Sequence, residues 1–136
     1  MSAAVAPPDL FVVLGGTGDL MERKLLPSLF AIATGAAPNG HPLHILACSR
    51  RPWDDRQYRE YAEQSLTNFA AAPAAVARKW AERYVSFQSF ESDSAQNFVR
   101  LKERIVSEES TRHLSGNRVL YLALPAEAFP PTIRGL

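Results

Sequence analysis

LFVVLGGTGDL, residues 10–20, is the stretch that decides the fold. Its first five residues form a short apolar run, which is typical of a strand buried on both faces of a parallel sheet. Glycines follow at once, where such a strand turns into a helix. They permit a tight turn and let the backbone approach a pyrophosphate, whose charge is stabilised by free N–H groups and the helix dipole. Residues 15–18, the glycine turn, therefore form a candidate phosphate site.

The rest of the chain repeats the alternation of strand and helix. Further apolar runs predict strands at residues 43–48, 84–88 and 119–124. Helical spacing of apolar residues predicts helices after the glycine turn, after Asp54 and Asp55, over residues 73–83, and behind a cap at Ser92, Asp93 or Ser94. Val76 and Trp80 are expected on one face of the third helix, and Phe98, Leu101 and Ile105 on the inner face of the fourth.

Pro27 lies inside the first expected helix. An interior proline removes a backbone donor, so it is tolerated if the regular helix begins near Lys24, and otherwise it kinks the helix.

This order predicts an α/β fold, a Rossmann-like parallel sheet with helices on both faces, which is the first half of a doubly wound dinucleotide-binding fold. The period-two alternation at residues 84–88 predicts a less buried edge strand, whereas the other three strands have interior composition. Without the second half of the sheet, the strand at 119–124 becomes an exposed edge. Residues 1–9 are expected to be a loose tail, and residues 10–136 one domain that is incomplete at its C-terminus.

Composition narrows the function classes. The 136 residues suit one domain, and 46% hydrophobic with 21% charged residues indicates a folded globular protein. A formal charge of +1 gives no bulk attraction to nucleic acid or to a membrane surface, and no apolar run reaches the length of a membrane span. The single cysteine, Cys48, is interpreted as a small buried hydrophobe and fits a reducing compartment, so a cytoplasmic location is expected.

The glycine turn and the first helical residues supply most of the candidate coenzyme site. These candidates are Gly15, Gly16, Thr17, Gly18, Asp19 and Leu20. The alternative is a turn that merely joins strand to helix. Thr17 either donates its hydroxyl to phosphate or satisfies the turn, and Asp19 is interpreted as a helix cap rather than a catalytic acid.

The end of the second strand selects the coenzyme. An acidic residue there would accept hydrogen bonds from the ribose of NAD, but the chain has Ser49, Arg50 and Arg51. A guanidinium favours the 2′-phosphate of NADP. The alternative is that the two arginines are solvated loop residues.

Other candidates are weaker. Tyr121, at the end of the fourth strand, faces the glycine turn and is either a coenzyme contact or core, and Lys24 reaches substrate or phosphate, or is surface charge. His41, His44 and His113 have no paired carboxylate or motif around them. No catalytic residue and no metal site is therefore assigned.

Taken together, these blocks resemble the glucose-6-phosphate dehydrogenase family, specifically its amino-terminal coenzyme domain. The matching blocks are GGTGDL at 15–20, RKLLP at 23–27, SR at 49–50, NRVLYLALP at 117–125 and FP at 129–130. The resemblance implies oxidation of glucose 6-phosphate to 6-phosphogluconolactone with NADP, at the entry to the pentose phosphate pathway. It implies that Arg50 holds the 2′-phosphate, that Tyr121 lines the coenzyme pocket, and that Lys24 lies beside coenzyme and substrate.

The same resemblance implies what the chain lacks. The family's Glu-Lys-Pro segment, its Asp-His-Tyr motif and its substrate domain would lie beyond Leu136. Residues 10–136 are therefore expected to supply only the NADP-binding part of a homo-oligomeric enzyme, and to be inactive alone.

Three other functions remain open on the sequence. A non-catalytic NADP-binding or sensing module would use the same turn. A short-chain reductase or epimerase is disfavoured because no Tyr-x-x-x-Lys arrangement is found. An interaction domain would use the glycines only to turn the chain.

Overall fold

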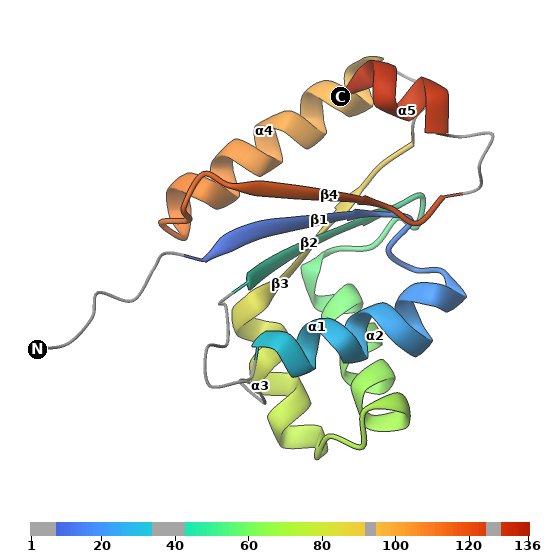
Figure 1. The fold of residues 1–136 in the computed structure, drawn as a ribbon, viewed down its shortest axis with the longest axis vertical. Helices are drawn as coiled ribbons and strands as arrows, with labels where there is room; N and C mark the ends of the chain where they lie inside the picture. Colours follow the sequence, from blue (N-terminus) through green and yellow to red (C-terminus); the bar gives the residue numbers. More distant parts are fainter. Residues whose placement is uncertain (1–7, 34–42, 92–94, 125–128) are drawn as a thin grey trace, which may run out of the picture.

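The computed structural model of the chain describes residues 8–33, 43–91, 95–124 and 129–136 (Figure 1). Strands and helices alternate, as the sequence predicts. The bounds are β1 Asp9–Leu14, the π-helical turn η1 Met21–Leu25, α1 Leu26–Ala33, β2 Leu43–Ser49, α2 Asp55–Phe69, α3 Ala74–Tyr84, β3 Val85–Ser89, α4 Ala95–Thr111, β4 Arg118–Leu122 and α5 Phe129–Gly135. The tail expected at residues 1–9 falls outside the described residues up to residue 7, and Asp9 already belongs to β1.

The four strands form one parallel sheet in the order β3-β2-β1-β4. Leu14, the last residue of β1, is level with Cys48 on β2 and with Leu122 on β4. The chain therefore runs outward from β1 to one edge of the sheet and then returns to pair on the other side of β1. This order confirms the predicted α/β Rossmann-like fold, and it brings the carboxyl ends of β1, β2 and β4 together.

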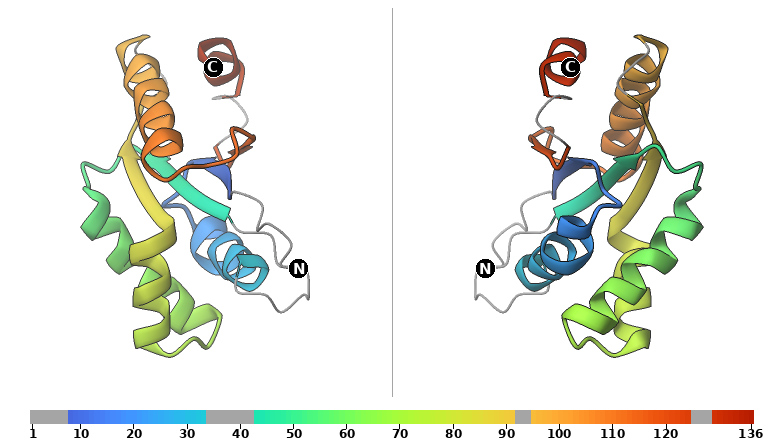
Figure 2. Two further views of the ribbon diagram at one scale, coloured as in Figure 1. Left: turned by 90° about the vertical axis from the view of Figure 1, so that its left-hand side faces the viewer. Right: turned by 90° about the vertical axis from the view of Figure 1, so that its right-hand side faces the viewer.

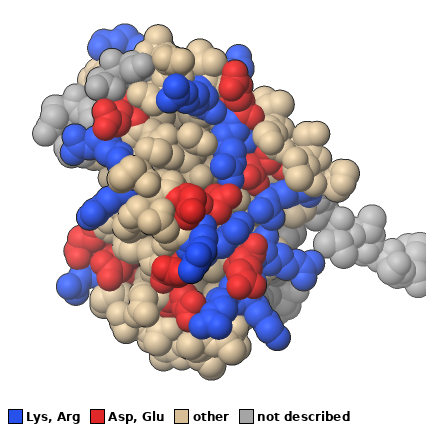
Figure 3. Space-filling model, turned by 180° about the vertical axis from the view of Figure 1, so that it is seen from behind, with Lys and Arg blue, Asp and Glu red and all other residues tan. Residues whose placement is uncertain are grey.

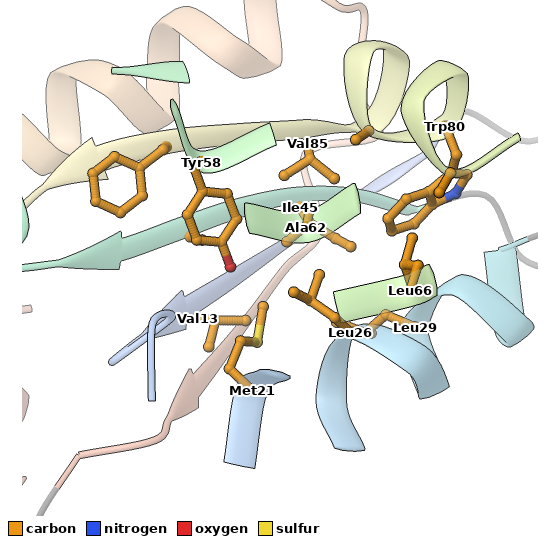
Figure 4. Packing of buried hydrophobic residues seen from close by; sticks show 14 of the residues in the cluster. Val13, Met21, Leu26, Leu29, Ile45, Tyr58, Ala62, Leu66, Trp80 and Val85 are labelled. Carbon is orange, nitrogen blue, oxygen red and sulfur yellow. The ribbon is translucent and has the colours of Figure 1, made fainter. Parts of the chain in front are cut away.

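Helices cover both faces of the sheet. Figures 1 and 2 show α1, α2 and α3 on one side and α4 with α5 on the other. Because successive strand residues point to opposite faces, Val13 and Ile45 pack with Leu66 and Trp80 under α1 to α3 (Figure 4). The residues that alternate with them form a second core under α4, which includes Val12 and Leu46. Strands β1 and β2 are thus buried on both faces, as their apolar runs predict.

The two edge strands differ from each other in burial. β3 is an edge strand, as predicted, but its polar Ser86 is fully buried, so the expectation of a half-exposed strand is wrong at that residue. The reason is a hydrogen bond from the neighbouring strand, described below. β4 has interior composition, yet Val119 and Leu120 are each 45% exposed, which confirms the exposed edge expected without further strands beside β4.

The first helix begins with a π-helical turn. In η1 the N–H of Leu26 donates to the carbonyl of Met21, five residues earlier, and α1 follows without a break. The regular helix therefore starts at Leu26 rather than near Lys24. Pro27 is the second residue of α1, where a missing N–H is tolerated.

The later helices match the sequence except at one residue. Asp54 caps α2, and its side chain and that of Gln57 form a capping box. In α3 Trp80 is buried, but Val76 is 48% exposed, so its expected place on the buried face is wrong. Ala77 lies there instead. α4 buries Leu101 and Ile105, with Phe98 packed beside them, which confirms its predicted inner face. The cap expected among residues 92–94 lies outside the described residues.

Candidate functional site

The glycine turn is fixed where the carboxyl ends of three strands meet. The N–H groups of Gly15 and Gly16 both donate to the carbonyl of Cys48, each at 2.8 Å, so the turn is fixed to the end of β2. The N–H of Ala123 donates to the carbonyl of Leu14 at 2.8 Å, so the residues after β4 lie against the same turn. The candidate site therefore occupies the switch point of the sheet, where parallel α/β folds bind their ligands.

Each glycine of the turn has its own role. Gly15 has a φ of +91°, and a Cβ there would run into the carbonyl of Ala123. At Gly16 a Cβ would lie 2.8 Å from the Cβ of Ala47. Gly18 is exposed, and a Cβ there would meet only the carbonyl oxygen of Gly15, at 3.7 Å. The first two glycines thus allow close packing on the strands, whereas the third keeps the outer side of the turn open to a ligand.

Some backbone donors of the turn are left for a ligand. The N–H of Gly18 donates to Gly15 at 3.4 Å, and that of Glu22 donates to Gly18 at 3.1 Å. Within the part of the chain that the structure describes, the N–H groups of Thr17 and Asp19 have no backbone acceptor. Free N–H groups before a helix are the donors that bind phosphate in dinucleotide-binding folds. The turn fits a pyrophosphate on this observation.

Helix α2 supplies a second layer of contacts that the sequence analysis missed. Its hydroxyl groups donate to carbonyls of the turn and of η1: Tyr58 to Gly16 at 2.7 Å, Tyr61 to Gly18 at 3.4 Å and Ser65 to Glu22 at 2.5 Å. Burial raises the pKa of both tyrosines, that of Tyr61 to about 12 with help from the Glu22 carboxylate, so both hydroxyls remain donors at neutral pH. The available signal was the spacing of three hydroxyls along one helix face.

The corner after β2 carries the two arginines. Arg50 is exposed directly after Ser49, the last residue of β2. Arg51 is also exposed, and its guanidinium lies 5.4 Å from the ring centroid of Trp53, so Arg51 has an aromatic packing partner. Cys48 is fully buried, and burial raises the pKa of its thiol, which confirms its interpretation as a small core residue.

The structure also places four further candidates from the sequence. The cap position of η1 is Leu20, with no side-chain capping bond, so the interpretation of Asp19 as a cap is wrong. Asp19 instead accepts a hydrogen bond from Arg23, one helical turn later, at 2.7 Å. Lys24 is exposed on η1. Tyr121 is half-buried on β4 and stacks on Phe11 with ring centroids 6.3 Å apart, so at least part of this side chain belongs to the core. Leu20 is 44% exposed beside the turn.

Histidine 44 corrects another expectation. His44 Nε2 lies 3.0 Å from the hydroxyl of Ser86 and 3.3 Å from a carboxylate oxygen of Glu108, so it does have a paired carboxylate. It is the second residue of β2, at the end of the strand opposite to the glycine turn. This pair therefore lies away from the candidate coenzyme site. His113 is exposed and His41 lies outside the described residues.

The face opposite to the view of Figure 1 carries no large area of one charge. On the face drawn in Figure 3, acidic and basic side chains are interspersed. A hollow of about 310 Å³ on α2 and α3 shares no lining residue with the glycine turn. It is lined by Arg56, Arg59, Glu60, Glu63, Arg78 and Glu82. Among the described residues, no three His, Cys, Asp or Glu side chains are grouped to hold a metal, and no helix is long and apolar enough to cross a bilayer.

Comparison with known proteins gives a consistent result. The family model described as "Glucose-6-phosphate dehydrogenase, NAD binding domain" matches residues 12–136. The chain is 30% identical over 132 residues to glucose-6-phosphate 1-dehydrogenase of Chlamydia muridarum, covering 96% of this chain and 26% of that protein. It is 29% identical over 122 residues to the Arabidopsis thaliana protein named glucose-6-phosphate 1-dehydrogenase 6, cytoplasmic, covering 88% and 24%. The chain thus spans about a quarter of the length of these relatives.

Solved structures show the same fold. A glucose-6-phosphate dehydrogenase in complex with its substrate glucose-6-phosphate superposes with a TM-score of 0.76 at 22% identity, over 100% of this chain and 28% of that one. Glucose-6-phosphate 1-dehydrogenase from Mycobacterium avium superposes with a TM-score of 0.75 at 20% identity, over 96% and 27%.

Proposed function

The chain belongs to the glucose-6-phosphate dehydrogenase family, and on this premise we propose that residues 10–136 are the NADP-binding part of an enzyme that oxidises glucose 6-phosphate to 6-phosphogluconolactone. The observation that carries the proposal is the glycine turn, which is held by two hydrogen bonds to Cys48 and offers N–H groups, at Thr17 and Asp19, that have no backbone acceptor in the described part of the chain. The family match supports a dinucleotide. The choice of NADP rests on Arg50 and on the lack of a carboxylate directly at the end of β2.

Different residues of the site are assigned to different parts of the coenzyme. The N–H groups of Thr17 and Asp19 donate to the pyrophosphate, and the Arg50 guanidinium pairs with the 2′-phosphate. Bound NADP⁺ supplies the nicotinamide ring that accepts a hydride. Tyr121 lines the coenzyme pocket, and Lys24 lies toward the substrate phosphate. No described residue is assigned as the general base that takes the proton of the sugar hydroxyl.

The names of related proteins support two further parts of the proposal. The related structure that carries glucose 6-phosphate supports that sugar phosphate as substrate. The Arabidopsis relatives named cytoplasmic support a cytoplasmic location. We propose a homo-oligomer for the whole enzyme.

Substitution of Arg50 tests the coenzyme assignment. Charge-assisted hydrogen bonds contribute about 1.5–3 kcal/mol, so Arg50→Ala should weaken NADP⁺ binding about tenfold or more and leave NAD⁺ binding unchanged. The measurement is the Kd of each coenzyme by calorimetry. Arg83→Ala is the matched control, because Arg83 is an exposed arginine packed on Tyr84 at the end of α3. An unchanged Kd for NADP⁺ in Arg50→Ala would remove Arg50 from the site.

A further inference from the structure

The carbonyl groups of the glycine turn are held from one side by α2. The Tyr58 hydroxyl donates to the Gly16 carbonyl at 2.7 Å, and the Tyr61 hydroxyl donates to the Gly18 carbonyl at 3.4 Å. Tyr58 is fully buried and Tyr61 half-buried. In Figure 4 the hydroxyl end of Tyr58 points toward the side of the sheet where Val13 and Met21 lie. Two hydroxyls from the same helix face therefore fix two peptide planes of the turn.

Fixing a carbonyl also fixes the N–H of the same peptide unit. A trans peptide is planar, with its C=O and N–H pointing in opposite directions, and the described residues contain no cis peptide. Holding the carbonyl of Gly16 toward α2 therefore directs the N–H of Thr17 away from α2. The carbonyl of Gly18 and the N–H of Asp19 are related in the same way. Neither of these N–H groups has a backbone acceptor among the described residues.

A third hydroxyl on the same helix face continues this arrangement into η1. In the π-helical pairing seen from Leu26 to Met21, the carbonyl of Glu22 would accept from residue 27, which is a proline and has no N–H. The Ser65 hydroxyl donates to that carbonyl at 2.5 Å instead. Ser65 thus replaces the donor that Pro27 lacks, and α2 is bound to the first helix directly after the turn.

We propose that Tyr58 and Tyr61 are positioning residues for the coenzyme, because they orient the N–H groups of Thr17 and Asp19 toward its pyrophosphate. This inference rests on the proposed function, since it requires that the turn bind a dinucleotide. It assigns to α2 a role that the glycine turn alone does not perform. Without the hydroxyls, the two peptide units lose the contacts that hold their carbonyls against α2, and the donors must be ordered by the ligand itself.

The ring of Tyr58 allows the hydroxyl to be removed alone. It stacks on Phe87 with centroids 5.1 Å apart and planes at 13°, and it also lies beside Trp53 at 6.4 Å. Phenylalanine keeps these ring contacts, so Tyr58→Phe removes the hydroxyl and leaves the packing. Tyr84→Phe is the matched control, because Tyr84 packs on Trp80 at the end of α3 and not on the turn.

The test compares two ligands that share the 2′-phosphate but not the pyrophosphate. The protein at its natural length is titrated with NADP⁺ and with adenosine 2′-monophosphate. Tyr58→Phe should weaken NADP⁺ binding about threefold to tenfold, the usual effect of one hydrogen bond, and leave adenosine 2′-monophosphate unchanged. Tyr61→Phe should show the same selectivity with a smaller change, because its bond is longer. Tyr84→Phe should bind both ligands as the unchanged protein does.

Each other outcome has a defined meaning. Equal weakening of both ligands by Tyr58→Phe and Tyr61→Phe would show a general loosening of the domain and overturn the positioning role. Unchanged NADP⁺ binding in both variants would also overturn it. If Tyr58→Phe does not fold, Tyr61→Phe, whose hydroxyl is only half-buried, decides alone. NADP⁺ binding by the unsubstituted protein is measured before any variant is compared. Failure of that protein to bind NADP⁺ would overturn the proposed function itself.

Discussion

The two ends of the sheet hold their polar groups in different ways. At the carboxyl ends, neutral hydrogen bonds hold the carbonyls of Gly16 and Gly18, and the N–H groups of Thr17 and Asp19 have no backbone acceptor among the described residues. Toward the amino ends of β2 and β3, on the α4 face, His44 and Ser86 meet Glu108 and its arginines. We call the glycine-turn end of the sheet the open end, because backbone donors there have no acceptor among the described residues. We call the end at His44, Ser86 and Glu108 the closed end, because its charged groups pair with one another.

At the closed end, both carboxylate oxygens of Glu108 have partners. One carboxylate oxygen of Glu108 accepts from Arg104 at 2.9 Å, and the other accepts from Arg112 at 2.6 Å and lies 3.3 Å from His44. Burial opposes ionisation of Glu108, but the hydrogen bonds from His44 and Arg112 and the charge of Arg104 outweigh it and hold its pKa below the ordinary value of 4.5. A buried group with every acceptor occupied joins α4 to the sheet. A buried charge is therefore no sign of a binding site in this chain.

Alanine at Gly15 should have the largest effect, because it disrupts the open end. The substitution combines a φ of +91° with a Cβ directed into the Ala123 carbonyl, so we expect a loss of about 4 kcal/mol in unfolding free energy together with loss of NADP⁺ binding. Gly116→Ala is the control, because Gly116 has the same φ and no atom within 4 Å of the added Cβ. It should cost about 1 kcal/mol by urea denaturation. Equal losses would mean that the contact with Ala123 does not matter.

Alanine at Glu108 should have the next largest effect, and it disrupts the closed end. Removing the carboxylate leaves Arg104 and Arg112 without their shared partner in a partly buried place, at a cost of about 3 kcal/mol. Glu60→Ala is the control, because Glu60 pairs with Arg56 and both side chains are mostly exposed, where an ion pair contributes under about 1 kcal/mol. Both are measured by urea denaturation. NADP⁺ binding by the folded fraction should survive in Glu108→Ala, and its loss would show that the two ends are coupled.

The same contrast explains what the sequence could predict. Strands that are buried on both faces can be recognised in the sequence as apolar runs. Gly15 and Gly16 mark the turn because local backbone geometry requires glycine at these positions. The candidate site was therefore located from residues close together in the chain. Hydrophobic spacing also found α2, but it counted Tyr58 only as an apolar residue. Its hydroxyl bond to Gly16 spans 42 positions, and no local pattern reports such a contact.

The closed end was hidden for the same reason. Glu108 lies on α4 and His44 on β2, so their pairing depends on how α4 crosses the sheet. The alternation at residues 84–88 correctly predicted an edge strand, but it wrongly suggested that Ser86 is exposed. A polar side chain is stably buried once it has a hydrogen-bond partner, and Ser86 has one in His44. The prediction for Val76 was wrong by one position along α3. The buried face of this helix contains Ala77 in place of Val76, together with Trp80.

The smallest expected effect is the change of unfolding free energy with pH that is caused by His44. Burial lowers the pKa of His44 below its ordinary value of 6.5, despite the opposing hydrogen bond to Glu108. Between that lowered pKa and 6.5 the unfolded chain binds a proton that the folded chain does not, so the contribution of His44 is complete above pH 6.5 and is lost as the pH falls below it. The expected slope for one proton is about 1.4 kcal/mol per pH unit.

Substitution isolates this slope from those of other groups. Glu108 acts in the same direction, but only as the pH falls through 4.5 and below, because its pKa is lowered from that value. Unfolding free energies measured between pH 7 and 5 therefore separate His44 from Glu108. His44→Gln retains an amide donor toward Glu108 and should flatten the slope, whereas His113→Gln, at an exposed histidine, should keep it. A slope that persists in His44→Gln would mean that a different group gains the proton on unfolding, and that the closed end of the sheet holds its histidine charged.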